Sequence, residues 1–591
     1  MINRSYLLLA LAVSVGCGGS KDTVGPVRPS SDISSMNVGE VRVFAPADIP
    51  NGIQLPATSS GRDYIVIVGN TNSQQDAVAN YVVRANRVGG VEPAQVSSGP
   101  SVGSGLGSVV LGGVDVPRTR QQSLDMKVRS FERSALRLRV PSGGMGLDRF
   151  ALRKSASVAT APVPAVGDKL NLKIPDASTN DLCNNFIRTQ AVVASVSRRA
   201  ILAVDTLDGP PIALFSQAQL DSITAEYDNI TYPTDSSYFG VPTDVDANGH
   251  VIILFTGQIN KLTPPGQSSF IGGFFFAGDF FPATGTQPGQ FCPQSNNAEI
   301  FYLLSPDPTG RFNNIRTTGS VRQGTRGTIA HEFQHMINAG NRFEDPNQCC
   351  FESTWLDEAL AHLAEEAVGR VQRGFTDLQT LTLADLVPTG NQAANNDFNA
   401  FFFQNFARLT YWMQRPDTSS GISAHADQNL SSRGAAWSLV RYSADNYSNS
   451  NPRTFARKLA AGPDTGTKNL VVSAKAPLDT LVAGWLVANY ADHLGISGLD
   501  PKYQFKAYNF RNIMPSVARS VTGSQSAVYP LQVLPIGSGT DNISSTNQTG
   551  SGTYYRLNVP SGSGDKTVKV LDPSGSLASF PGAHIYVLRV Q

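Results

Sequence analysis

The sequence predicts an α+β protein in which a central part of mixed strands and helices lies between two β-rich flanks. Short alternating runs such as "DYIVIVGN" and "YYRLNVPSG" occur near both ends of the chain and are typical of half-buried strands. Between them, apolar strand candidates such as "RRAILAVDTL" and "HVIILFTG" are mixed with helical patterns such as "SQAQLDSITAEYDNI". At 591 residues, the chain is too long for a single hydrophobic core.

The composition favours an extracellular type of protein. Hydrophobic residues make up 41% and charged residues 16%, with 54 Gly and 36 Pro, which indicates many loops. The formal net charge of +1 gives no bulk attraction to nucleic acid or to acidic membranes. We therefore expect no nucleic-acid partner.

The N-terminus predicts export. Arg4 precedes an apolar run over residues 6–15, which has the length of the hydrophobic region of a signal peptide and is too short to span a bilayer. The following "SVGCGGS" resembles a bacterial lipoprotein signal, which implies a signal peptide over residues 1–17 and a lipid anchor on Cys17. Ser14 departs from the usual Leu or Val, and an ordinary secretory signal is the alternative. We expect a cell-surface or outer-membrane lipoprotein, or otherwise a secreted protein, with membrane contact only through Cys17.

Composition shifts divide the rest of the chain. We predict a tether over 18–35, a β-sandwich-like domain over 36–95, a linker with a basic helical segment over 96–165, a mixed domain over 166–500 and a C-terminal β-rich domain over 505–591. The basic helix at 123–140 is either solvent-exposed or part of a pro-segment. Four cysteines remain after Cys17, namely Cys183, Cys292, Cys349 and Cys350, and their spacing leaves three disulfide pairings open.

The stretch "DVDANG" is a candidate calcium loop. Asp244, Asp246 and Asn248 match the first ligands of an EF-hand-type loop, with Gly249 at the turn. The twelfth position is Phe255, so the usual bidentate glutamate is missing. A hairpin turn before "VIILF" is the alternative.

The stretch "TIAHEFQHMINAG" (328–340) carries the clearest chemistry. In a helix, His331 and His335 lie one turn apart on one face, where both imidazoles can reach one metal ion. Glu332 lies about 100° further round the helix and can act as general base on a metal-bound water. Gly340 is a candidate helix stop.

A second helix, near 353–368, offers a third ligand. Glu358, His362 and Glu365 share one face of "FESTWLDEALAHLAEEAVG", and an apolar stripe forms another. We predict one zinc ion per chain, held by His331, His335 and Glu358. Glu365 lies two turns further on and is expected at most to support the site.

The stretches "HEFQHMIN" and "WLDEALAHLAEE" resemble the gluzincin metallopeptidases, and more narrowly the hyicolysin-type neutral metallopeptidases. The resemblance runs from about 165 to 500. It implies a zincin-like core, zinc binding by His331, His335 and Glu358, and catalysis by Glu332. Asp357 stands where the family has Asn, and Ala359 where it has Gly, which leaves Asp357 as an alternative ligand.

A second donor to the oxyanion is expected in such a site. His362 is one candidate and is alternatively a group that orients a ligand. Tyr411 and Tyr442 are further candidates, with packed core tyrosines as the alternative reading.

We therefore predict an extracytoplasmic zinc metalloendopeptidase that acts on proteins or peptides. The alternatives are a gluzincin aminopeptidase and a surface adhesion protein with a vestigial zincin domain. The sequence lacks the G-x-M-E-N stretch of the aminopeptidases, since "GGMG" (143–146) does not match it. It predicts no oligomeric state.

Overall fold

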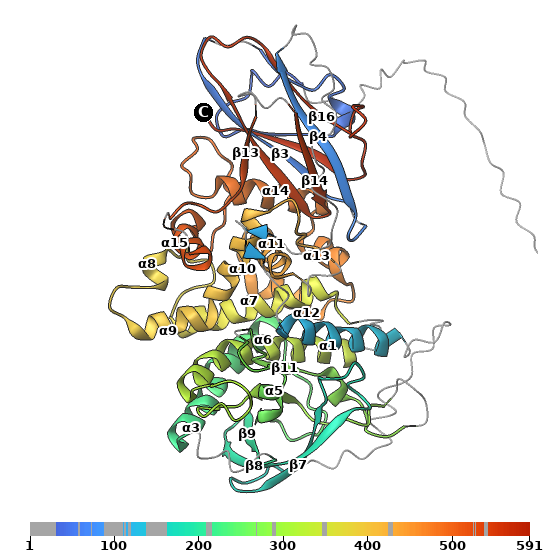
Figure 1. Cartoon of the computed structure of the whole chain (residues 1–591), viewed down its shortest axis with the longest axis vertical. Coiled ribbons are helices and arrows are strands. Elements are labelled where there is room, and N and C mark those ends of the chain that lie inside the picture. Colours follow the sequence, from blue (N-terminus) through green and yellow to red (C-terminus); the bar gives the residue numbers. More distant parts are fainter. Residues whose placement is uncertain are drawn as a thin grey trace, which may run out of the picture.

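The computed structural model describes residues 31–591 except 57–58, 73, 88–109, 112–113, 116–119, 138–161, 208–214, 268, 286–290, 345–350, 424–428, 524, 526 and 537–541. The predicted signal peptide with Cys17, and both Cys349 and Cys350, lie outside the described residues. Three parts follow one another along the long axis: a sheet with its helices, a helical middle and a β-sandwich (Figure 1).

The first part is built on a six-stranded sheet of order β11-β12-β10-β9-β8-β7. Strands β9, β10 and β12 run parallel and are buried along their whole length, as their continuous apolar sequences require. The short strand β11 pairs antiparallel with β12 and forms one edge of the sheet. The strands are β7 (Lys169–Pro175), β8 (Phe186–Val196), β9 (Ala200–Asp205), β10 (Val251–Thr256), β11 (Gly273–Phe275) and β12 (Ile300–Leu304).

The helices of this part are α3 (Gln217–Glu226), α4 (Tyr232–Phe239), α5 (Gly257–Lys261) and α6 (Thr318–Glu344). Helix α6 packs against β11 and β12 on one side and against α7 on the other. Gly340 does not end α6, contrary to the sequence prediction. A Cβ atom at this position would lie 2.6 Å from Thr243 Cγ2, so glycine is needed here for close packing inside the helix.

The helical middle contains α7 (Thr354–Gln372), α8 (Leu383–Leu386), α9 (Gln392–Phe401), α10 (Phe403–Gln414), α11 (Leu430–Tyr447), α12 (Pro452–Ala461), α13 (Gly466–Ala474), α14 (Leu478–Ala491) and α15 (Phe510–Thr522). Helix α7 is buried from Thr354 to Arg370, because it packs between α6 and α11. Helix α15 packs on α10, so the C-terminal β-rich region does not begin at residue 505, as predicted, but after this helix.

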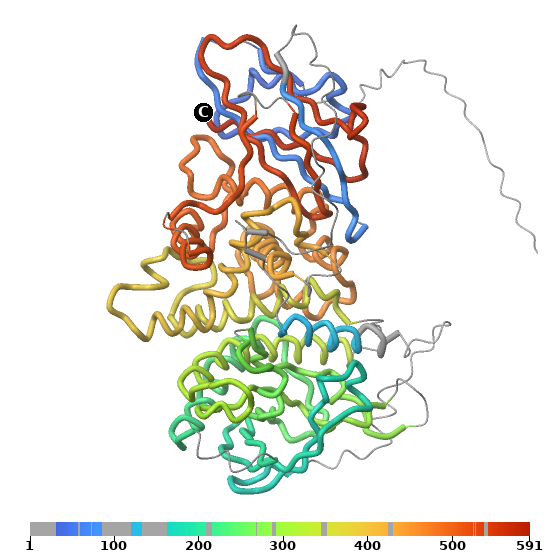
Figure 2. The backbone as a smooth tube through the Cα atoms, in the orientation of Figure 1, coloured from blue at the N-terminus to red at the C-terminus, as the bar shows by residue number. Residues whose placement is uncertain are grey.

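The two β-rich ends of the chain are not separate domains, which corrects the sequence prediction. They form one sandwich of a five-stranded sheet, β1-β17-β3-β15-β13, and a four-stranded sheet, β14-β4-β16-β2. Figure 2 shows the N-terminal blue chain interleaved with the C-terminal red chain. The strands are β1 (Val41–Phe44), β2 (Ile53–Leu55), β3 (Arg62–Asn70), β4 (Val78–Arg87), β13 (Val533–Ile536), β14 (Asn542–Gln548), β15 (Ser551–Val559), β16 (Lys566–Leu571) and β17 (Ala583–Arg589).

The predicted tether also ends earlier than expected. Ile33 is fully buried in the sandwich core, and its backbone N–H donates to Gln54 O at 3.1 Å. Elsewhere, Cys183 and Cys292 form a disulfide with a Cα–Cα distance of 5.0 Å, which selects one of the pairings left open by the sequence.

Helix α1 (Arg120–Arg137) lies across the boundary between the sheet part and the helical middle (Figure 1). It is not a solvated helix, because Leu124 and Val128 belong to the main hydrophobic core. Lys127 Nζ donates to Ala177 O at 2.7 Å, and Phe131 packs on Phe276 with ring centroids 4.7 Å apart. The segment predicted as linker thus contains an element that is docked on the rest of the chain.

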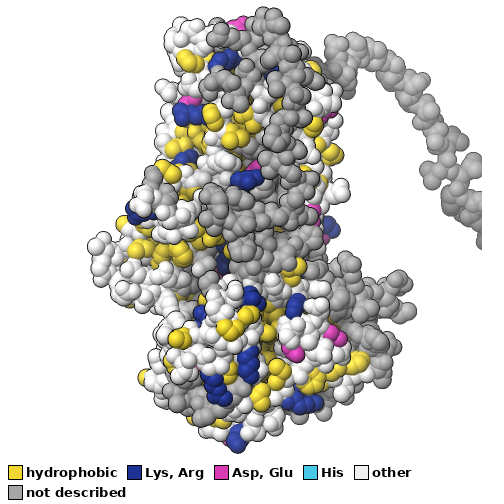
Figure 3. All heavy atoms as spheres, in the orientation of Figure 1, with side chains coloured by type: hydrophobic (Ala, Val, Ile, Leu, Met, Phe, Trp, Pro, Cys, Tyr) yellow, Lys and Arg dark blue, Asp and Glu magenta, His cyan; other side chains and the backbone are white. Residues whose placement is uncertain are grey.

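On the face shown in Figure 3, basic and acidic side chains are scattered and form no large patch of one charge. Among the described residues, no single helix has the length and apolar character needed to cross a membrane. The bent pair α13 and α14 meets that criterion only when the two helices are taken together.

Candidate metal centre

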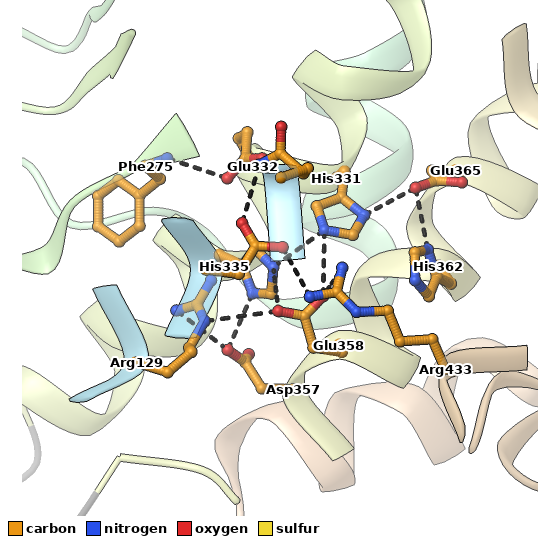
Figure 4. A network of polar contacts seen from close by, with 12 residues as sticks. Arg129, Phe275, His331, Glu332, His335, Asp357, Glu358, His362, Glu365 and Arg433 are labelled. Carbon is orange, nitrogen blue, oxygen red and sulfur yellow. Dashed lines mark hydrogen bonds and ion pairs between the residues drawn. The ribbon is translucent and has the colours of Figure 1, made fainter. Parts of the chain in front are cut away.

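Helices α6 and α7 bring His331, His335 and Glu358 together (Figure 4). The two Nε2 atoms of the histidines lie 3.2 Å apart. Glu358 Oε2 lies 3.5 Å from His331 Nε2, and Glu358 Oε1 lies 3.9 Å from His335 Nε2. One ligand atom from each residue therefore faces a common point.

The other nitrogen of each imidazole faces a carboxylate. His331 Nδ1 lies 2.7 Å from Glu365 Oε1, and His335 Nδ1 lies 2.9 Å from Asp357 Oδ2. A carboxylate at Nδ1 holds the proton there and leaves Nε2 with a lone pair. Either a proton on one Nε2 atom or a cation between the two accounts for their separation of 3.2 Å.

Zinc fits this arrangement. Two nitrogens bound to one tetrahedral zinc at about 2.0–2.1 Å lie about 3.3 Å apart, close to the distance between the two Nε2 atoms. Both oxygens of Glu358 are buried and accept no hydrogen bond from the chain in its described ranges. The nearest basic groups are Arg433 Nη1, 3.1 Å from Oε2, and Arg129 Nε, 3.6 Å from Oε1. The three side chains are thus oriented toward one another, with two arginines beside Glu358.

The electrostatics of this position favour a positive charge. Burial lowers the pKa of His331, but Glu358 and Glu365 outweigh burial and raise it to about 10. Burial and the charge of Arg129 lower the pKa of His335, which favours the neutral imidazole that a metal needs. The position between the carboxylates therefore takes up positive charge, either as a proton or as a metal ion.

Glu332 points to the other side of α6, toward the edge strand. Its Oε2 accepts a hydrogen bond from Phe275 N of β11 at 2.9 Å. Burial raises the pKa of Glu332 to about 8, and nearby Asp125 adds to this rise. A carboxylate with a raised pKa beside a metal centre has the affinity for protons that a general base requires.

The sequence predicts Asp357 as an alternative ligand and Glu365 as a supporting group. In the structure, both lie behind the imidazoles, at the Nδ1 atoms, so Asp357 faces away from the point shared by the three ligand atoms. Asn338 Nδ2 donates to Asp357 Oδ1 at 2.7 Å and fixes this orientation.

His362 shares Glu365 with His331. Its Nδ1 lies 3.0 Å from Glu365 Oε1, so His331, His362 and Glu365 form a second group that could hold a metal ion. A proton on His331 Nδ1 explains its contact with Glu365 without a metal, and we therefore favour the first group. The alternative that His362 orients a ligand through Glu365 fits this geometry better than the role of oxyanion donor.

The two tyrosines considered from the sequence differ in position. Tyr442 is fully buried, and its hydroxyl donates to Lys502 O at 2.9 Å, as in a packed core tyrosine. Tyr411 is partly exposed on α10, three residues after Arg408, whose Nη1 lies 3.2 Å from His362 Nδ1. Of the two, only Tyr411 retains the oxyanion role as a hypothesis.

Three residues of helix α1 reach the site and were not assigned to it from the sequence. Arg129 Nη1 lies 3.3 Å from Asp357 Oδ2, in addition to its contact with Glu358. Asp125 Oδ2 lies 2.6 Å from Arg433 Nη2. Gln121 donates to Gly273 O at 2.9 Å and accepts from Gly272 N at 3.0 Å, so its amide pairs with the edge strand.

The candidate calcium residues lie outside this centre, in the loop before β10. Asp244 and Asp246 group with Glu299, which the sequence analysis missed because it lies in a distant segment. Asn248 Nδ2 donates to Asp246 Oδ2 at 2.6 Å, and its Oδ1 accepts from His250 N at 2.7 Å. Asn248 thus joins two other positions of the loop, Asp246 and His250, by hydrogen bonds.

Comparison with known proteins gives one partial similarity. No family model matches the chain. Over 147 residues, the chain is 33% identical to "Neutral metalloprotease ShpI" of Staphylococcus hyicus. The match covers 25% of this chain and 30% of that relative, so the chain spans less than a third of the protein it resembles.

Proposed function

We propose that the protein is a zinc-dependent metalloendopeptidase. The observation that carries this proposal is the convergence of two Nε2 atoms and a buried carboxylate, with a second carboxylate beside the Nδ1 atom of each imidazole. The partial similarity to a neutral metalloprotease supports the same class. His331, His335 and Glu358 would hold the zinc ion, one per chain.

Zinc, when bound, polarises a carbonyl group and lowers the pKa of a bound water. Glu332 would accept the proton of the attacking water and pass it to the leaving amine. Glu365 and Asp357 would keep His331 and His335 in the correct tautomer. The hydrogen bond from Phe275 N would hold the carboxylate of Glu332 in place.

The edge strand β11 offers a binding surface for an extended peptide. Gly272 N and Gly273 O are the backbone groups to which the Gln121 amide binds. An extended substrate can use the same groups by adding a strand to the sheet edge. Such a substrate would run beside Glu332, which accepts a hydrogen bond from Phe275 N of the same strand.

Helix α1 occupies this region, so a polypeptide can reach the site only after α1 has moved. Its contacts with β11, Asp357, Glu358 and Arg433 together cover the ligands and the strand edge. We propose that the docked helix keeps the enzyme latent, which develops the pro-segment alternative for this region.

We propose an extracytoplasmic location, with a lipid anchor at Cys17 or as a secreted protein, and proteins or peptides as substrates. The aminopeptidase and the adhesion protein remain the competing functions. An intact set of ligands plus Glu332 favours a working peptidase over a vestigial domain.

The test is digestion of casein, with and without a chelator, by the zinc-loaded protein after α1 has been undocked or removed. We expect cleavage that the chelator abolishes and zinc restores. Peptides acetylated at the N-terminus should be cut internally as fast as free peptides. Release of single N-terminal residues, blocked by acetylation, would establish the aminopeptidase instead, and zinc binding without any cleavage after removal of α1 would favour the adhesion protein.

A further inference from the structure

The loop before β10 closes over a buried carboxylate from another segment. Glu299 directly precedes β12, and its Oε1 accepts hydrogen bonds from Thr243 Oγ1 at 2.6 Å and from Val245 N at 2.9 Å. Asp244 and Asp246 belong to the same loop. One carboxylate oxygen from each of the three acidic residues lies within 4.8 Å of the others. Glu299 thus supplies the carboxylate that the loop sequence lacks at Phe255.

The second oxygen of Glu299 has no partner. Glu299 is 1% exposed, and within the described part of the chain its Oε2 is buried without a hydrogen bond. Burial raises the pKa of Glu299 to about 8, and the charges of Asp246 and Asp244 contribute to the rise. A bare carboxylate oxygen inside a protein is costly unless a cation or a proton satisfies it.

We propose that Asp244, Asp246 and Glu299 bind one Ca²⁺ ion. The donors are all oxygens, which hard cations prefer, and Ca²⁺ accepts irregular ligand arrangements that the near-ideal octahedron of Mg²⁺ does not. The loop turns sharply at Ala247 and Gly249, which have φ values of 58° and 72°. His250, the basic side chain beside the loop, turns its ring nitrogens toward Asn248 O and Ser197 O, at 2.6 and 3.0 Å, rather than toward the carboxylates.

The ion would steady the helix that carries the metal centre. Thr243, which donates to Glu299, packs so closely on α6 that residue 340 must be glycine. Gly340 lies five residues after His335 on the same helix. Calcium would therefore hold the loop against α6 and limit the movement of that helix. This inference does not depend on peptidase activity.

The test is calorimetric titration of the full-length, calcium-free protein with Ca²⁺ alone, together with thermal unfolding. We expect one Ca²⁺ per chain and a rise in Tm. Glu299→Gln keeps an oxygen for Thr243 and Val245 but removes the charge, and should weaken binding at least about tenfold, since a charged ligand is lost.

The exposed Asp244 gives a second variant that should fold normally, and Asp244→Asn should also weaken binding. Asp279→Asn is the matched control, because Asp279 is another buried carboxyl, but Tyr302 and Asn296 donate to it. This control should bind Ca²⁺ like the wild type. The proposal is wrong if millimolar Ca²⁺ neither binds to the wild type nor raises its Tm, or if the Glu299 and Asp244 variants bind Ca²⁺ unchanged.

Discussion

Asp357 Oδ2 lies 2.9 Å from His335 Nδ1, on the edge of the imidazole opposite the nitrogen that faces Glu358. The two neighbouring acidic residues of α7 therefore act on the same histidine from opposite sides. In the proposed centre, Glu358 would share the metal position with His335, whereas Asp357 would orient its ring. This relationship separates a ligand from a supporting group that is only one residue away in the sequence.

Zinc affinity should distinguish these two roles. Asp357→Ala is expected to lower it by about 10–100-fold, as for other carboxylates behind a ligating histidine. Glu358→Ala removes a ligand and should lower it further, because two imidazoles alone hold zinc poorly. Competition with a chromogenic chelator measures both. A larger loss in the Asp357 variant than in the Glu358 variant would identify Asp357 as the ligand.

Glu332→Gln should separate binding from chemistry. The variant is expected to keep about one zinc per chain, since Glu332 is not a ligand, and to lose about 10²–10⁴-fold in kcat/KM toward a quenched peptide. The half-exposed Asp500 provides a carboxylate-to-amide control, and Asp500→Asn should behave as wild type. An active Glu332→Gln enzyme would exclude Glu332 as the general base.

A charge inside the α1 interface should release the site. Val128 is 1% exposed, so Val128→Asp is expected to undock α1, raise cleavage of a short peptide at least about tenfold and speed the removal of zinc by a chelator. Ser130 is exposed on the same helix, and Ser130→Asp is the matched control. The chelator measurement needs no activity, so unchanged zinc release in a folded Val128 variant would refute the covering role by itself.

Asp279 should make stability depend on pH. Burial raises the pKa of this carboxyl from 3.8 to about 7, so the folded state holds the proton more tightly than the unfolded chain. The stability that this tightly held proton adds to the folded state is complete below about pH 4 and is lost as the pH rises to about 7. Between pH 5 and 8, the free energy of unfolding should fall by about 2–3 kcal/mol more in the wild type than in Asp279→Asn. Denaturant unfolding at both values checks this, and equal slopes would contradict it.

Local patterns in the sequence were sufficient to find the residues that converge at the metal centre. His331 and His335 are one helical turn apart, and Glu358 lies on the next helix, so spacing and amphipathicity suffice. The residues that support these histidines were harder to predict. The side of His335 on which Asp357 lies depends on how α6 crosses α7, and such a crossing leaves no local pattern.

The features that the sequence did not reveal depend on contacts between distant segments. Glu299 completes an acidic group with a loop more than fifty residues earlier, as its contact with Val245 shows. Helix α1 has an amphipathic, basic sequence that is compatible with solvent, and only its docking on Asp357 and Glu358 reveals a buried face. Strand patterns identified both β-rich ends but not their pairing, because period-two alternation does not specify a partner.

The shared sandwich has a consequence for how the molecule forms. The hydrogen bond from Asn70 to Asn547 O joins residues 477 positions apart, and β3 lies between β15 and β17 in its sheet. Contacts between residues so far apart in the sequence form slowly, because a long loop must close before they contribute to stability. During synthesis, β1 to β4 therefore wait with unpaired edges until the last strands emerge, while the central helices and sheet can fold first. A chain that stops before residue 542 would leave its own beginning unfolded and open to proteases.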